Sequence, residues 1–181
     1  MKRKAFLLLL LATSFALGFV QENVKVNINF ILDQGDRMTG FFDQTAEVKK
    51  QWLDQQKIFS PLDYYYSHST LDVFLSVSKV WLVRLKWINT VVFTALFLVL
   101  NGAVIQLITR DVKMVRHLVL AYAVSFAAAF ALYAIGIATG YALELYAVSR
   151  KLIGALQSMV PLMIFIPAWY LYTHFQNTNS R

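Results

Sequence analysis

The sequence predicts an all-α membrane protein with four transmembrane helices, and three observations support this fold class. First, the 181 residues are 58% hydrophobic and only 15% charged, which is too apolar for an ordinary soluble domain. Second, three runs without Asp, Glu, Lys or Arg are long enough for the roughly 20 residues that span a hydrocarbon core. They lie within Trp87–Thr109, His117–Leu143 and Leu152–Tyr172, and a shorter run, Ala5–Val20, follows the basic start MKRK.

The third observation is that the net charge of +7 lies at the ends of these runs. Residues 21–86 carry eight basic and eight acidic side chains, so the excess lies at residues 2–4, in RDVKMVR (110–116), at Arg150 and Lys151, and at Arg181. Cations that flank apolar runs set membrane topology and do not form a phosphate-tracking surface, so we expect no nucleic-acid partner. With residues 2–4 inside, both termini are cytoplasmic.

The first element, residues 1–20, is expected to be an N-terminal anchor helix. A cleaved signal peptide is the alternative, because ALG (16–18) resembles a small-x-small cleavage site, although the apolar run continues beyond it. In either case the chain that follows begins outside, and residues 21–86 form an exoplasmic segment.

Within the exoplasmic segment, three patterns predict local structure. Apolar residues alternate with polar ones from Val24 to Phe30, which favours an extended, strand-like stretch. A short polar helix is expected near Thr45–Gln56, with Val48 and Trp52 on one face. An amphipathic helix near 70–86 is expected to lie at the outer interface and to bend into the second transmembrane helix.

A three-helix membrane domain over 87–173 and a cytoplasmic tail over 174–181 complete the expected organisation. Small residues and amides on these helices are candidates for helix packing, because they allow close backbone approach and interhelical hydrogen bonds. The candidates are Asn101, Gly136, Gly140, Gly154 and Gln157.

Neither catalysis nor metal binding is predicted. Asp63, Ser67 and His68 lie close together in sequence, but adjacency supplies neither a fixed base nor an oxyanion donor, and these residues also suit a turn. The three histidines fall on opposite sides of the expected membrane, and the chain has no cysteine. We therefore expect no enzyme activity, no cofactor and no metal.

In this topology Arg150 and Lys151 fall on the outer face with Arg84 and Lys86, against the usual bias of basic residues toward the inside. One interpretation is snorkelling of the cations to lipid phosphates. Another is a cationic rim that binds a partner protein, and an inverted topology is a third. Glu144 is expected to pair with Arg150 or Lys151.

The stretches RLKWINTVVFTALFLVL, VKMVRHLVLAY and LYAVSRKLIGALQSMVPLMIFIPAWYLY resemble the small membrane proteins that accompany exosortases in Bacteroidetes-type bacteria. The resemblance covers roughly residues 84–172. The matching positions are Arg84 or Lys86 with Ile88, Asn89 and Thr90; Val115 and Arg116; Tyr146, Arg150, Lys151, Leu152 and Ile153; and Ile166, Pro167, Ala168, Trp169 and Tyr170. The chain is similar to exosortase F system-associated proteins, but its exoplasmic segment is longer, which points to a sister system.

The resemblance implies a non-enzymatic accessory protein of the bacterial inner membrane. Exosortases carry a catalytic cysteine, which this chain lacks, so the implied partner is an exosortase-like polytopic membrane protein, with membrane lipid as a further partner. The implied partner-binding residues are Arg84, Lys86, Asn89, Arg150 and Lys151. The alternative is a small structural subunit of another inner-membrane complex, such as a respiratory or transport assembly.

Overall fold

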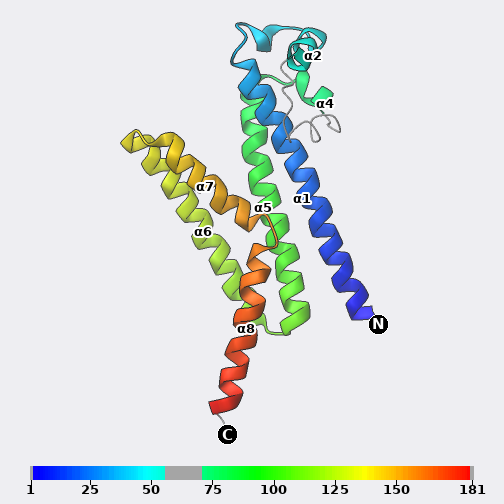
Figure 1. Cartoon of the computed structure of the whole chain (residues 1–181), viewed down its shortest axis with the longest axis vertical. Helices are drawn as coiled ribbons and strands as arrows, with labels where there is room; N and C mark the ends of the chain where they lie inside the picture. The colour runs from blue at the N-terminus through cyan, green and yellow to red at the C-terminus, as the bar shows by residue number, and fades with distance from the viewer. Residues whose placement is uncertain (1, 56–70, 180–181) are drawn as a thin grey trace. The chain divides into compact units, whose positions relative to one another are not determined.

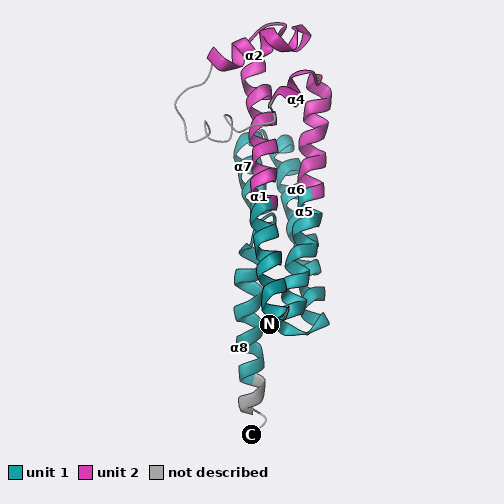
Figure 2. Ribbon diagram, turned by 90° about the vertical axis from the view of Figure 1, so that its right-hand side faces the viewer, with its two compact units in different colours: residues 1–16, 93–181 teal, residues 17–92 magenta. Residues whose placement is uncertain are grey.

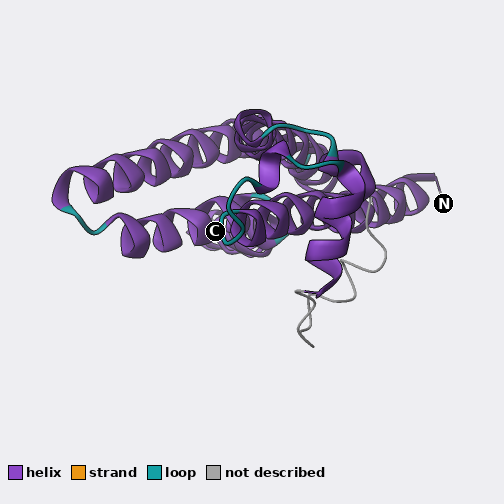
Figure 3. Ribbon diagram, turned by 90° about the horizontal axis from the view of Figure 1, so that it is seen from above, coloured by secondary structure: helices purple, strands orange, loops and turns teal. Residues whose placement is uncertain are grey.

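The computed structural model describes residues 2–55 and 71–179, and within these ranges every regular element is a helix (Figure 1). The elements are α1 (Lys2–Gly35), the 3₁₀ helix η1 (Phe41–Asp43), α2 (Ala46–Gln55), α4 (Leu71–Leu75), α5 (Lys79–Thr109), α6 (Val112–Thr139), α7 (Ala142–Leu156) and α8 (Val160–Asn179). Figure 3 shows no strand in the described part of the chain, so the all-α prediction is confirmed there.

Three helices are long and apolar enough to cross a membrane: α1 over Arg3–Gly35, α5, and α6. The pair α7 and α8 meets the same criterion only when taken together, and the two helices are bent by 61° at the break between them. The chain therefore has three to four candidate membrane-spanning helices. The straight fourth helix expected over Leu152–Tyr172 is not present.

The chain divides into two compact units (Figure 2). Unit 1 comprises Met1–Ala16 and Phe93–Arg181, and unit 2 comprises Leu17–Val92. Because α1 and α5 are each continuous, both contribute residues to both units. Unit 2 contains the whole segment 21–86 that the sequence separates from the membrane domain.

The strand-like interpretation of residues 24–30 is wrong, because α1 continues through them to Gly35. The same residues also fit a helical period, since Val24, Ile28 and Ile31 follow at i, i+4 and i+7. Ile28 and Ile31 are buried in the core of unit 2, with Val24 packed against them. The seven residues 24–30 fit the period of a strand and the period of a helix equally well. Burial of one helical face decides between the two.

Four segments complete the unit 2 core with α1: η1, α2, α4 and the first turns of α5. The buried residues are Ile28, Ile31, Phe41, Leu53, Leu75 and Leu82. The chain turns tightly after α1, since a Cβ atom on Gly35 would lie 2.7 Å from the Phe41 ring. A helix at α2 was predicted, but its buried residues are Lys49 and Leu53 rather than Val48, which is exposed.

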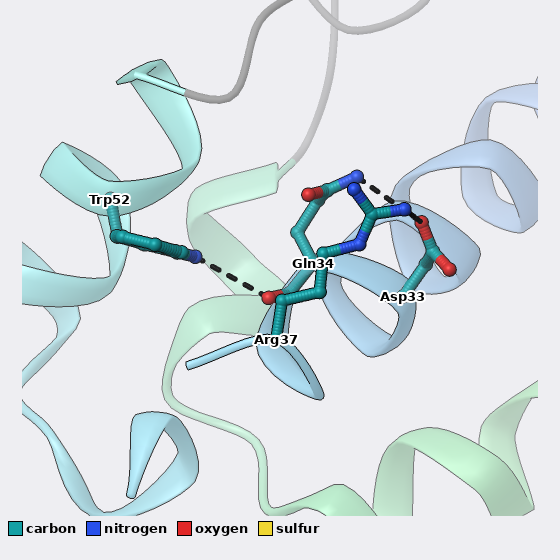
Figure 4. Close-up of polar contacts among 4 residues, drawn as sticks. All are labelled: Asp33, Gln34, Arg37 and Trp52. Atoms are coloured by element: carbon teal, nitrogen blue, oxygen red, sulfur yellow. Dashed lines mark hydrogen bonds and ion pairs between the residues drawn. The ribbon is translucent and has the colours of Figure 1, made fainter. Parts of the chain in front are cut away.

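A hydrogen bond joins α2 to the end of α1 (Figure 4). The indole N–H of Trp52 donates to the main-chain carbonyl of Gln34 at 3.3 Å. Nearby, Arg37 and the Gln34 amide both donate to Oδ2 of Asp33, at 3.2 and 3.1 Å. The Gln34 carbonyl also accepts from the main-chain N–H of Arg37 at 3.2 Å, so Trp52 is the second donor to a carbonyl near the C-terminus of α1.

The single amphipathic helix expected near 70–86 is not what the structure shows over its described residues. Helix α4 ends at Leu75, residues 76–78 are not helical, and Lys79 begins the 31-residue α5. Leu75 and Leu82, on either side of the interruption, are both buried in the unit 2 core. Apolar spacing across 70–86 therefore reflects two helices that share one core.

In unit 1, charged residues lie at the turn that joins α5 to α6. Asp111 is the N-cap of α6, and its carboxylate accepts a hydrogen bond from the Lys113 N–H at 2.8 Å. The Arg3 guanidinium donates to the last carbonyls of α5, at Leu107 and Ile108. A cation at a helix C-terminus is favourable because it meets orphan carbonyls and the negative end of the helix dipole. The basic start of the chain therefore lies at the same end of unit 1 as the turn at residues 110–111 and the first turn of α6.

Candidate functional site

The first candidate site is the break between α7 and α8, which Pro161 explains. Proline has no N–H, and its ring clashes with the carbonyl four residues earlier, here that of Gln157. Helix α7 therefore ends at Leu156, and Pro161 takes the second position of α8, where a missing N–H is tolerated. The side chain of Ser158 accepts from the Val160 N–H at 3.1 Å and so caps the new helix.

Four polar side chains, which we call the break cluster, surround this interruption: Thr94, Asn101, Tyr122 and Gln157. The Tyr122 hydroxyl donates to the Leu156 carbonyl at 2.6 Å, and the Asn101 amide donates to the Ser158 carbonyl at 3.0 Å. Asn101 also donates to the Tyr122 oxygen at 2.8 Å. Carbonyls freed by the break are thus satisfied by neighbouring helices, as a helix break at membrane depth requires.

The cluster gathers residues that the sequence predicts and one that it missed. Asn101, which is 0% exposed, and Gln157 were expected to pack helices, and the Gln157 amide donates to the Thr94 hydroxyl at 2.9 Å. Tyr122 was not predicted. The feature of the sequence that could have identified Tyr122 is its hydroxyl within an apolar run, since a buried tyrosine normally finds a hydrogen-bond partner.

The three candidate glycines have different surroundings. Gly136 is buried against the start of α7, where an added Cβ would lie 3.2 Å from the Ala142 Cα and the Tyr141 oxygen. Gly140 is the left-handed C-cap of α6, with φ of 82°, and a Cβ there would meet nothing within 4 Å. Gly154 is exposed on α7, and a Cβ there would also meet nothing within 4 Å. Of these three glycines, only Gly136 lies at a close helix–helix contact.

The second candidate site is the cation pair of α7, Arg150 and Lys151. The prediction that it marks the entrance of the fourth span is wrong, because α7 begins eight residues earlier at Ala142 and folds back along α6. The neighbouring Ser149 hydroxyl donates to the Ala129 carbonyl at 2.9 Å, which places the pair beside the middle of α6. Both cations are exposed, and Arg150 lies over the Tyr146 ring at 5.8 Å.

The expected ion pair of Glu144 with Arg150 or Lys151 does not form among the described residues. Lys151 is seven positions along the helix from Glu144, a rise of about 10 Å, and Arg150 is six positions away, on a different face. Glu144 is exposed near the start of α7. In unit 1 the other carboxylate, Asp111, caps α6.

The remaining predicted partner residues, Arg84, Lys86 and Asn89, belong to unit 2 and lie near the start of α5. Arg84 is exposed, and its guanidinium lies 4.9 Å from the ring centroid of the exposed Trp81. Lys86 and Asn89 are half-buried. An Arg–Trp pair beside Lys86 has the composition of a membrane-interface belt.

Among the described residues, no group of three His, Asp or Glu side chains could hold a metal ion. The Asp63, Ser67 and His68 group lies outside the described residues. That these residues are not catalytic therefore stays a prediction from the sequence.

Comparison with known proteins assigns no family to the chain. No family model matches it, and neither a curated protein nor a solved structure is significantly similar to it.

Proposed function

We propose that the chain is a non-enzymatic accessory protein of an exosortase-type sorting system in a bacterial inner membrane. In this role it binds the sorting enzyme or its clients and does no chemistry of its own. The observation that carries the proposal is that Tyr146, Arg150 and Lys151, which the resemblance singles out, lie together on α7. There the two cations are exposed and form no ion pair with the described residues.

The proposed topology has both termini in the cytoplasm and unit 2 on the outer side. What supports it is that cations gather at one end of unit 1, where Arg3 donates to the end of α5 and Arg110, Lys113 and Arg116 follow at the turn and at the start of α6. The positive-inside rule assigns such an end to the cytoplasm. In this topology the first turns of α5, with Arg84 and Trp81, lie at the outer interface.

The test is the double variant Arg150→Gln/Lys151→Gln in the native cell. We expect loss of client processing with unchanged abundance of the protein, because both residues are exposed and their removal leaves the unit 1 core intact. A matched control is Arg37→Gln/Lys50→Gln, which removes two exposed cations that have ion-pair partners within unit 2. Normal processing in the α7 double variant would refute the proposal.

A second candidate is a small structural subunit of another inner-membrane complex. What favours it is the nature of the break cluster, which contains only amides and hydroxyls whose bonds serve the α7–α8 break. Such a cluster stabilises a helix and contains no carboxylate, histidine, lysine or arginine that could carry a proton or bind a transported ion. This candidate predicts copurification with respiratory or transport subunits and normal client processing in every variant.

A further inference from the structure

The cation pair of α7 has no carboxylate within reach in unit 1. Beyond residue 86 the sequence carries only two acidic residues, Asp111 and Glu144. Asp111 caps the far end of α6, and Glu144 lies near the other end of the hairpin that α6 and α7 form. Arg150 has the Tyr146 ring as a partner, whereas Lys151 makes no ion pair or hydrogen bond with the described residues.

Along the hairpin that α6 and α7 form, the cation pair lies close to the middle of α6, which is a candidate membrane span. Arg150 lies nine residues beyond the N-cap Tyr141, a rise of about 14 Å, and Ala129 lies 13 residues beyond Arg116, a rise of about 20 Å. The hydrocarbon core is about 30 Å thick. If α6 crosses the membrane, the pair therefore lies well below the outer surface.

The exposed side chains around the pair indicate the same depth. On the turn side of the pair, the exposed apolar residues include Ile135 and Ile137 on α6 and Leu143 and Val148 on α7, and the exposed Glu144 lies close to the turn. Past the break, α8 exposes Met163 and Ile164. Apolar surface on both sides of the cations is expected in lipid, whereas a pair at the water boundary would leave the turn-side residues in water.

We propose that Arg150 and Lys151 pair, within the membrane, with a carboxylate on a transmembrane helix of a partner protein. Charged side chains at this depth are rare and are almost always paired, and charge complementarity selects an acidic group. Lys151 lies ten residues, or about 15 Å, along α7 from the N-cap Tyr141. This is farther than a lysine side chain reaches, which disfavours a lipid phosphate at the level of the turn.

The face of α7 that carries the cations suits close approach of such a helix. Ala147 and Gly154 lie four residues before and three residues after Lys151, on the same side of the helix. A Cβ at Gly154 would meet nothing within 4 Å, so the space beside it is open. Small residues beside a polar group are typical of interfaces between membrane helices. This inference deepens the proposed function by naming the chemistry of the partner, and it rests on that function for the identity of the partner alone.

The first test measures depth, and the chain suits it because it has no cysteine. Lys151→Cys and Leu143→Cys are each exposed, in intact cells, to a maleimide that cannot cross membranes. Leu143, which is 82% exposed near the turn, is the matched control for the outer boundary. We expect Leu143→Cys to react at least tenfold faster than Lys151→Cys. Equal rates would place the cations at the water surface and overturn the inference.

The second test identifies what lies against the pair. A benzoylphenylalanine at Val148, an exposed position three residues before Lys151, is photo-crosslinked in native membranes, and the attached peptide is sequenced. We expect a transmembrane peptide that contains Asp or Glu, retained with Lys151→Arg and lost with Arg150→Gln/Lys151→Gln or Gly154→Leu. Val124→Leu, at an exposed position of α6, is the control for a larger residue on a lipid face.

Crosslinks to lipid alone, to a peptide without a carboxylate, or at equal yield in the charge-removed variant would each overturn the inference. A carboxylate-bearing helix from a protein outside any sorting system would support the inference and refute the sorting function. Loss of client processing in the charge-removed variant, without such a crosslink, would support the sorting function and refute the inference.

Discussion

Units 1 and 2 satisfy their charged and polar groups in different ways. In unit 2, cations pair with carboxylates of the same unit: Lys25 with Glu22, Arg37 with Asp33, Lys50 with Asp72, and Lys79 with Asp36. In unit 1, Arg3 donates to carbonyls at the end of α5, and the break cluster joins neutral amides and hydroxyls to one another and to carbonyls. Arg150 and Lys151 form no ion pair among the described residues.

This difference teaches what each unit needs from its surroundings. Exposed ion pairs around an apolar core are the pattern of a domain that folds in water. Neutral hydrogen bonds inside an exposed apolar surface are the pattern of a bundle in lipid. Among the described residues, unit 2 therefore supplies carboxylates for four of its own cations, whereas Arg150 and Lys151 of unit 1 have no counter-charge.

The largest expected effect compares one leucine from each core. Leu53 in unit 2 and Leu118 in unit 1 are both 0% exposed. Leu53→Ala is expected to lower the free energy of unfolding of unit 2 by about 2–5 kcal/mol. Leu118→Ala is expected to lower that of unit 1 by roughly 2 kcal/mol less, because lipid tails solvate leucine as well as the core does.

Hydrogen exchange measured by mass spectrometry in lipid bicelles, peptide by peptide, reports the two units separately. An equal loss of protection in both variants would contradict the assignment of unit 2 to water and unit 1 to lipid.

The next effect separates two glycines of the α6–α7 hairpin. Gly136→Ala places a Cβ 3.2 Å from backbone atoms of α7 and is expected to destabilise unit 1 by about 1–3 kcal/mol. Gly154→Ala enters open space on a helix and is expected to be neutral or to stabilise by up to about 1 kcal/mol. Thermal unfolding in one detergent compares the two. A larger loss of stability in Gly154→Ala than in Gly136→Ala would contradict the close contact of α6 with α7 at Gly136.

A smaller effect is expected in the break cluster. Tyr122→Phe removes the hydroxyl that donates to the Leu156 carbonyl at 2.6 Å. Interhelical hydrogen bonds in membranes contribute about 0.6–2 kcal/mol, so we expect a loss of that size in the free energy of unfolding in mixed micelles. Tyr133→Phe, on a part of α6 away from the break, is the control. Faster exchange near residues 156–160 in Tyr122→Phe alone would locate the loss at the break.

The sequence predicts the helical class and the apolar runs well, because the length and composition of a membrane span are local properties. It misplaces the fourth helix, because Pro161, which lies inside the expected span Leu152–Tyr172, stands in the first turn of α8. The ring of Pro161 accounts for the break between α7 and α8. The break is tolerated because Asn101 and Tyr122, which are far away in sequence, donate hydrogen bonds to carbonyls at the break.

The same limit applies to the candidate site. Arg150 and Lys151 are recognisable as an unusual pair, yet their position beside Ala129 depends on the fold-back of α7, which a run of apolar residues does not specify. In unit 2, the alternation of residues 24–30 predicts a strand only until Ile28 and Ile31 are known to share a core with Leu53. Tertiary contacts decide both cases.

The smallest effect compares two adjacent lysines of α2, which have opposite surroundings. Lys49 is 5% exposed, and its ammonium donates to the Leu75 carbonyl at 3.1 Å and lies 6.0 Å from the Phe41 ring centroid. Lys50 is exposed and pairs with Asp72 at 3.0 Å. Lys49→Met is expected to lower the stability of unit 2 by about 1 kcal/mol, because it leaves the Leu75 carbonyl without its donor.

Lys50→Met is expected to lower stability by less than about 0.5 kcal/mol, since both partners are solvated and screened. At 1 M salt, where the screening length falls to about 3 Å, the Lys50 effect should vanish while the Lys49 effect persists. Chemical unfolding followed by hydrogen exchange of the α2 peptide measures both. An equal response of the two variants to salt would mean that Lys49 is not buried, and the Lys49–Leu75 contact would then not help to hold α4 against α2.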